Sequence, residues 1–320
     1  SRNDEFADFG DAGWENGNAP LSQLKKPEML AGEYAREALK RGLQIQQRTG
    51  VNPYAFGMIG STDSHTGLST FEENNFFGKF SSDEPSASRM HGIVNPGIAA
   101  TRIGHQYLAG GLAAVWATAN TRAAIFDAMM RREVYATTGT RMSVRLFGGW
   151  NFAPSIFSAD WVKIGYQYGV PMGGNLAAGK SAPRFIVQAL KDPMGANLDR
   201  IQIVKGWIDS QGMTREKVFD VVWSAPKKRK ITNGMLTPVG DTVDLATATY
   251  ANSIGAAELR TVWRDPEYKP EQKAFYYARI LEIPTPRWTA FDVVRFKAKP
   301  PAGAKLKDQE RAYTSPIWVG

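Results

Sequence analysis

The chain has 320 residues, 43% of them hydrophobic and 22% charged, with 39 Lys and Arg residues against 31 Asp and Glu residues. This composition excludes disorder for the bulk of the chain, and the length predicts about two domains. The absence of cysteine excludes disulfides, thiolate metal sites and a cysteine nucleophile, and no apolar run reaches the length of a membrane span.

The beginning of the chain contains acidic residues and one predicted helix. Three acidic residues are candidates for the wall of a functional site: Asp4, Glu5 and Asp8. Residues 32–50 have the spacing of an amphipathic helix, which would place Tyr34, Ala38 and Ile45 on one face. Gly50 occupies the position at which a left-handed residue commonly ends a helix. We therefore predict that the helix ends at Gly50.

The segment YAFGMIG at 54–60 is almost continuously apolar, which is typical of a strand buried on both faces of a parallel sheet. The octapeptide GSTDSHTG at 60–67 follows it. In an extended segment residues i and i+2 point to the same side, so Asp63 and His65 can converge on one metal ion. Barrel and open α/β enzymes hold their active sites at such strand ends. The alternative is a turn in which Asp63 caps a backbone amide and His65 lies on the surface.

Residues 61–105 form a long loop rich in Ser, Asn, Gly and Pro, and loops of this length are usually functional or disordered. Glu72 and Glu73 could serve as a metal ligand and a general base, because a carboxylate near a metal-bound water can take its proton. Lys79 could bind a substrate anion. Each of these side chains could also be an ordinary solvated group of the loop.

The segment after this loop predicts a second strand and a second helix. LAAVWA at 112–117 resembles a buried strand, and Asn120 or Thr121 can cap a helix that runs through Arg132 with Met129 facing inward. An order of strand, loop, helix and strand is typical of a parallel sheet or barrel.

The pentapeptide TTGTR at 137–141 lies at an expected strand end. Thr138, Thr140 and Arg141 could bind a phosphate or carboxylate through their hydroxyl groups and guanidinium. The high β-propensity of threonine explains the two threonines equally well.

From about residue 146 the pattern changes to short alternating strands separated by turns, which is typical of a β-sandwich or of a sheet packed on the first domain. The predicted strands are 184–190, 201–209, 217–224, 242–250, 257–263 and 274–282. We therefore predict an α/β domain at 1–145 and a β-rich accessory domain at 146–320.

The tract PKKRK at 226–230 is the densest basic run of a chain with an isoelectric point near 9.5. Such tracts occur in nucleic-acid-binding proteins. This one lies between a predicted strand and the turn signal Asn233-Gly234, so we interpret it as a solvated hairpin tip and expect nucleic acid not to be a partner. The positive charge would attract anionic substrates such as phosphate esters.

The stretch GSTDSHTGLSTFEENNFFGKF at 60–80 resembles the signature of a bacterial family of unknown function related to the PHP (polymerase and histidinol phosphatase) metal-dependent phosphoesterases. Other segments that resemble this family are 32–43, 111–142, 275–288 and 310–319. In PHP-like proteins a late D-x-H supplies ligands to a cluster of two or three divalent metals. The resemblance implies that Asp63 and His65 are metal ligands, for Mn, Zn or Fe.

The chain departs from the PHP pattern, which opens with an H-x-H motif that this chain lacks. Its three histidines, His65, His91 and His105, are far apart, and we expect the latter two to be structural or exposed. The resemblance therefore implies the C-terminal part of a PHP-like (β/α) barrel followed by a β-rich, sandwich-like domain. An upstream N-terminal fragment of the same protein is the expected partner that completes the metal site.

The resemblance implies a metal-dependent hydrolase that acts on a small anionic phosphoester, as a phosphomonoesterase or phosphodiesterase. Two other classes stay open: a non-catalytic module that binds a glycan or a protein, and a nucleic-acid-binding protein. A periplasmic or secreted location is expected by the same resemblance, with the cytoplasm as the alternative.

Overall fold

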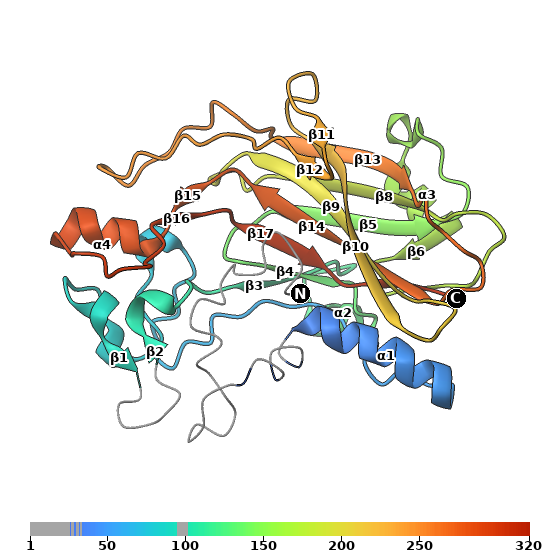
Figure 1. Cartoon of the computed structure of the whole chain (residues 1–320), viewed down its shortest axis with the longest axis horizontal. Coiled ribbons are helices and arrows are strands. Elements are labelled where there is room, and N and C mark those ends of the chain that lie inside the picture. The colour runs from blue at the N-terminus through green and yellow to red at the C-terminus, as the bar shows by residue number, and fades with distance from the viewer. Residues whose placement is uncertain (1–25, 27–28, 30–31, 33, 95–101) are drawn as a thin grey trace.

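The computed structural model describes residues 26, 29, 32, 34–94 and 102–320. The candidates Asp4, Glu5 and Asp8 lie outside the described residues. Two β-sheets lie face to face, and helices and loops surround them (Figure 1). No helix in the described part of the chain is both long enough and apolar enough to cross a membrane.

The larger sheet has the strand order β10-β9-β14-β17-β4-β3, with β18 beside β14 and β7 beside β18. Its strands are β3 (Leu112–Val115), β4 (Val134–Thr137), β7 (Asn175–Leu176), β9 (Leu198–Ile208), β10 (Thr214–Trp223), β14 (Ala274–Glu282), β17 (Arg311–Thr314) and β18 (Ile317–Val319). β3 and β4 precede residue 146 and yet belong to this sheet. One sheet therefore extends across the predicted boundary between 1–145 and 146–320.

The smaller sheet has the order β13-β8-β5-β6. Its strands are β5 (Ser143–Gly149), β6 (Gly169–Pro171), β8 (Arg184–Leu190) and β13 (Glu258–Arg264). Two-residue strands form three further pairs: β1 (Ile93–Val94) with β2 (Arg102–Ile103), β11 (Ile231–Thr232) with β12 (Met235–Leu236), and β15 (Thr285–Pro286) with β16 (Lys307–Asp308). The predicted strands 184–190 and 274–282 coincide with β8 and β14, whereas 242–250 consists of turns and is wrong as a strand.

The main core fills the space between the two sheets. Val187 and Phe185 of the smaller sheet contact this core from one side, and Ile203, Tyr276 and Ile280 of the larger sheet from the other. These side chains alternate along their strands with residues that face outward, as the two-residue period of a strand requires. The sandwich is therefore held together by a continuous apolar layer.

Helix α1 (Ala35–Thr49) covers the outer face of the larger sheet. Leu39 and Leu43 pack there on Phe275 and Tyr277 of β14. The predicted end of the helix at Gly50 is confirmed, since this residue has φ 82 and donates from its backbone N–H to Gln46 O. The predicted inward face of Tyr34, Ala38 and Ile45 was wrong, because the buried residues of the helix are Arg36, Leu39, Lys40, Gly42 and Leu43.

Three further α-helices lie at the periphery: α2 (Arg122–Met130), α3 (Trp161–Tyr168) and α4 (Trp288–Phe296). Thr121 caps α2 as predicted, because its hydroxyl accepts from Ala124 N at 3.3 Å. The helix ends at Met130 and not at Arg132, and Met129 is exposed instead of inward. The 3-10 helices are η3 (Glu73–Asn75), η4 (Ser81–Asp83), η5 (Arg89–His91), η6 (Gly104–Gln106) and η7 (Ile156–Ser158).

The predicted PHP-like (β/α) barrel is wrong. Pairing is antiparallel throughout the two sheets except between β7 and β18, and the described strands form no closed barrel. Residues 54–60 are not a strand: this segment lies extended beside the edge strand β3, with Gly60 N donating to Leu112 O and Gly111 N to Ser61 O. Its apolar side chains pack into the cluster under α1. The apolar run therefore reflects packing under a helix, and the expectation of a parallel sheet does not follow.

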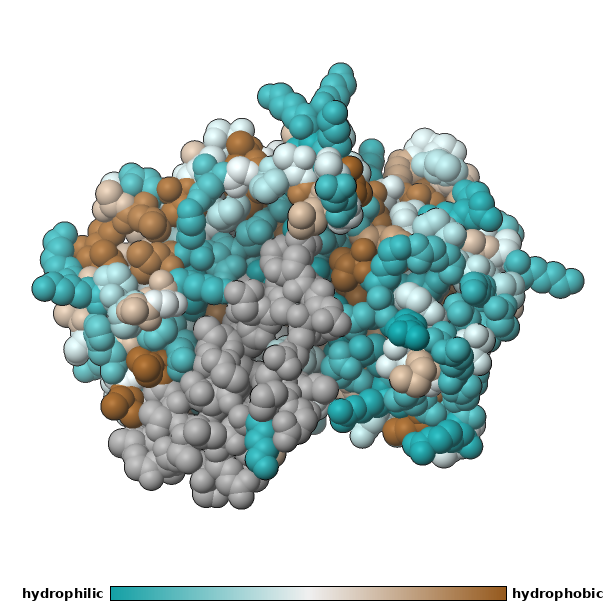
Figure 2. Space-filling view, in the orientation of Figure 1, coloured by the Kyte–Doolittle hydropathy of each residue, from teal (hydrophilic) through white to brown (hydrophobic). Residues whose placement is uncertain are grey.

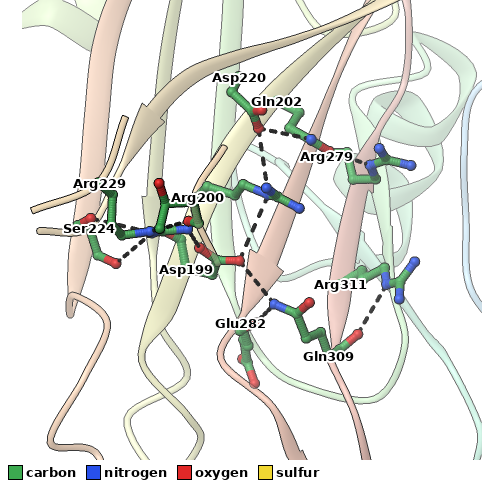
Figure 3. A network of polar contacts seen from close by, with 11 residues as sticks. Asp199, Arg200, Gln202, Asp220, Ser224, Arg229, Arg279, Glu282, Gln309 and Arg311 are labelled. Carbon is green, nitrogen blue, oxygen red and sulfur yellow. Dashed lines mark hydrogen bonds and ion pairs between the residues drawn. The ribbon is translucent and has the colours of Figure 1, made fainter. Parts of the chain in front are cut away.

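A polar network lies on the outer face of the larger sheet, at the end that α1 does not cover. There β9, β10, β14 and β17 carry charged residues side by side (Figure 3). Gln202 bridges Arg279 and Asp220, with hydrogen bonds of 2.8 Å to each. Arg229 belongs to this network: its Nη2 lies 2.6 Å from Asp199 Oδ1, and the residue is buried. The prediction of a fully solvated tip at 226–230 is thus wrong for Arg229, and the hairpin tip is instead Asn233-Gly234 between β11 and β12.

Candidate functional site

The D-x-H motif lies on the surface, where the chain leaves the edge of β3. Thr62 packs closely on Gly110, where a Cβ would come within 2.8 Å of Thr62 Cγ2. His65 N then donates to Lys79 O at 2.8 Å, which closes the base of the loop of residues 65–79. Asp63 and His65 are both exposed at this base.

The orientation of the His65 ring is set by a backbone carbonyl. Its Nδ1 lies 2.9 Å from Asp63 O, and because a carbonyl oxygen only accepts, Nδ1 carries the proton. In the neutral imidazole Nε2 then holds the lone pair, and no hydrogen bond occupies it among the described residues. The ring also packs on Phe80, with 4.8 Å between ring centroids. This arrangement is the one that orients histidine ligands in metal sites.

The carboxylate of Asp63 is held by Lys79. Lys79 Nζ lies 2.5 Å from Asp63 Oδ2, and 71% of the Asp63 side chain is exposed. Asp63 has φ 51, a left-handed conformation that aspartate adopts several times more often than most residues, so the chain is not extended at this position as the same-side argument for Asp63 and His65 assumed. Lys79, predicted to bind a substrate anion, therefore lies at the motif and makes an ion pair with Asp63.

The tip of the same loop carries Glu72 and contacts the TTGTR segment. Arg141 stacks on Phe71, with its Cζ 5.0 Å from the ring centroid, and its Nη1 lies 3.9 Å from Glu72 Oε1. Gly139 has φ 128, and a Cβ there would lie 2.5 Å from Phe71 O, so this close approach requires glycine. Glu72 and Arg141 are the predicted polar residues that are brought together here, and both remain open to solvent.

Glu73 is placed differently from Glu72. Its Oε2 accepts from the backbone N–H of Trp288 at 2.5 Å, at the first residue of α4. Burial raises the pKa of the Glu73 carboxyl, and the nearby Arg287 guanidinium opposes this increase. Glu73 thus accepts a hydrogen bond from a backbone N–H in the first turn of α4, which has no partner within the helix.

Thr138 and Thr140 turn toward buried carboxyl groups. The Thr138 hydroxyl donates to Glu310 and accepts from Arg311 N at 2.9 Å. The Thr140 hydroxyl is buried near Glu282, a residue that is only 1% exposed. Burial raises the pKa of Glu310 to about 8, with the nearby Glu73 charge adding to the increase. Neither hydroxyl is positioned here to bind a phosphate from solvent.

The raised pKa of Glu310 predicts a loss of stability with increasing pH. The folded state keeps a proton that the unfolded carboxyl releases near its ordinary pKa of 4.5, so stability falls as the pH rises from there to about 8. We expect Glu310 to contribute a loss on the order of a few kcal/mol over this window, so Glu310→Gln should lose less stability than the wild type does. Urea unfolding at several pH values measures both slopes.

The control for this experiment is Glu271→Gln, which changes an exposed glutamate beside Ile208, just before the start of β14, whereas Glu282 and Glu310 lie at the end of that strand. Its slope should match that of the wild type. If Glu310→Gln also matched the wild type, Glu310 would not be the group that releases the proton.

The two other histidines take part in local contacts. His91 Nε2 lies 2.7 Å from Lys299 O. His105 is buried, and burial followed by the charge of Arg287 lowers its pKa. Neither contacts the D-x-H motif, and within the described ranges no three His, Asp or Glu side chains are grouped so as to hold a metal ion.

Sequence reasoning missed Glu282 and Glu310, which have the most strongly raised carboxyl pKa values near the TTGTR segment. Glu282 ends a strand that was predicted correctly, but nothing in the alternation of that strand separates a buried glutamate from a solvated one. The missed pair of Arg89 and Asp292 joins the long loop to α4 across 203 positions of sequence, and no local pattern could indicate it.

Comparisons with known proteins give one result. A family model described as "Protein of unknown function (DUF3604)" matches residues 1–320. No curated protein and no solved structure matches the chain.

Proposed function

We propose that this chain, which belongs to the DUF3604 family, is the part of a metal-dependent phosphoester hydrolase that supplies the D-x-H ligands. The observation that carries the proposal is the orientation of His65, an exposed residue whose Nδ1–H donates to Asp63 O, which leaves Nε2 as the ring nitrogen with the lone pair. A carboxylate oxygen and an imidazole nitrogen are ligands that suit Mn, Zn and Fe ions. The relation to PHP phosphoesterases remains part of this proposal.

The residues of the motif fit part of a metal site. Asp63 offers the Oδ1 atom that Lys79 does not occupy, and His65 offers Nε2. Two ligands do not satisfy a divalent ion, so the remaining ligands come, in this proposal, from an upstream fragment of the same protein. When bound, the metal ions would lower the pKa of a water molecule and polarise the phosphoryl oxygen.

The side chains around the motif have separate roles in this proposal. Lys79 holds the Asp63 carboxylate at the base of the loop. Arg141 is 60% exposed at the loop tip and binds an anionic group of the substrate, because its planar guanidinium matches phosphate oxygens. Glu72 lies beside Arg141 and would act as the general base that takes the proton of a metal-bound water.

The test is metal content and hydrolysis in the protein with its upstream polypeptide retained. Asp63→Ala and His65→Ala should each lose bound metal on dialysis and lower kcat/KM for p-nitrophenyl phosphate or its bis-ester by about 100-fold or more, since even residues behind the ligands contribute 10- to 100-fold. Elemental analysis and absorbance assays measure these effects.

The matched control is His91→Ala, because His91 is also exposed but directs its Nε2 to Lys299 O. It should retain the metal content and activity of the wild type. Unchanged metal occupancy in both motif variants would reject the assignment of Asp63 and His65.

A further inference from the structure

A cavity of about 260 Å³ lies between the loop of residues 68–77 and helix α4. Its apolar walls come from Leu68, Phe76 and Phe77 on the loop side and from Phe291 on α4. Figure 2 shows apolar surface over the end of the molecule that carries α4. The volume is below the range of about 300–1,000 Å³ that is typical of drug-sized ligands, so the cavity suits a small molecule.

Three of the four charged residues that line the cavity are engaged with protein groups. Arg89 makes hydrogen bonds of 2.5 and 2.8 Å to the two oxygens of Asp292, and both side chains are almost fully buried. Glu73 accepts from Trp288 N and lies near Arg287. These groups therefore balance one another and leave little charge for a ligand.

Arg295 is the fourth charged residue and differs from the others. It is exposed in the last turn of α4, its Cζ lies 5.3 Å from the Phe291 ring centroid, and its Nη1 donates to Asn74 O at 2.5 Å. No carboxylate of the described residues lies within ion-pair distance of it. Its remaining donors thus stand beside an aromatic wall at the edge of the cavity.

We infer that this cavity binds a small carboxylate with a flat apolar body, with the carboxylate on Arg295 and the body against Phe77 and Phe291. A flat body stacks on aromatic side chains, and a planar carboxylate matches the fork of one guanidinium. The inference does not depend on the proposed hydrolase, because it uses neither Asp63 nor His65.

The test is calorimetric titration of the full chain with 1-naphthoate and with the neutral 1-naphthalenemethanol. Naphthoate should bind more tightly than the alcohol. Arg295→Gln should weaken naphthoate binding roughly 10- to 100-fold, which is the usual loss for one charged hydrogen bond, and leave the alcohol unchanged. The control Arg260→Gln changes an arginine that stacks on Phe157 in the same manner, at 5.0 Å, on β13, and it should change neither affinity.

A second variant tests the apolar part of the site. Phe291→Ala should weaken both ligands and leave the metal content of the intact protein unaltered, so that this inference and the hydrolase can fail separately. The inference is overturned if neither ligand binds the wild type, if Arg295→Gln leaves naphthoate binding intact, or if Arg260→Gln weakens it equally. Thermal unfolding of each variant establishes that the fold is retained.

Discussion

Replacing Lys205 by methionine is expected to lower the free energy of unfolding by about 3–5 kcal/mol, because one charge of a buried pair loses its partner. Lys205 points from β9 into the space between the sheets, where its Nζ lies 2.6 Å from Asp265 Oδ2 and 2.9 Å from Glu267 O. Tyr276 donates to the same carboxylate oxygen at 2.7 Å. Without the ammonium group, the Asp265 charge would remain in an apolar region with only the Tyr276 hydroxyl and the backbone N–H of Glu267 as donors among the described hydrogen bonds.

The matched control is Lys217→Met. Lys217 is the cross-strand partner of Lys205 on β10. It forms an ion pair with Glu267 in which both side chains are exposed. An exposed pair contributes about 0–1 kcal/mol, so this variant should unfold almost as the wild type does. Urea unfolding followed by tryptophan fluorescence measures both. Equal losses in the two variants would show that burial of Lys205 does not determine the cost.

The double variant Lys205→Met with Asp265→Leu separates the effect of the unpaired charge from the effect of altered packing. If the loss in the single variant comes from the unpaired carboxylate, removing this carboxylate as well should restore part of the stability. A further loss in the double variant, with no recovery, would mean that packing around the Lys205 stem causes most of the effect.

Replacing Arg229 by serine is expected to cost about 3 kcal/mol, whereas replacing its lysine neighbours should cost less than about 0.5 kcal/mol. Arg229 pairs with Asp199 at 2.6 Å and donates to Ser224 Oγ at 3.2 Å (Figure 3). It also donates to Thr237 O at 2.8 Å. Asp199 keeps a bond from Gln309 after the substitution, so the loss is smaller than for a fully isolated charge.

The comparison uses Arg229→Ser and the triple variant Lys227→Ser, Lys228→Ser and Lys230→Ser, with unfolding by urea for each. The three lysines are exposed. A stable Arg229→Ser protein would restore the interpretation of the whole tract as a solvated turn. If the triple variant lost a salt-dependent affinity for DNA, the basic tract would be a nucleic-acid contact after all.

The features of the fold that depend on residues close together in the chain could be predicted from the sequence. The helix end at Gly50 and the cap at Thr121 follow from backbone conformations and hydrogen bonds within a few residues. The strands β8 and β14 follow from alternation and β-propensity in the same way. The prediction of a long loop at 61–105 also holds for the residues that the structure describes, where no element exceeds three residues.

The tertiary structure alone decided which segments pair and which polar groups are buried. An apolar run such as 54–60 can be buried by a parallel sheet or by packing under a helix, and the choice depends on residues far away in sequence. Likewise, the sequence alone does not distinguish Arg229 from its lysine neighbours, and only the fold places Asp199 beside it. Glu73 differs from Glu72 only because the fold places its carboxylate at the first residue of α4. Long-range contacts set these environments, because the cost of burying a charge depends on the partner that the fold provides.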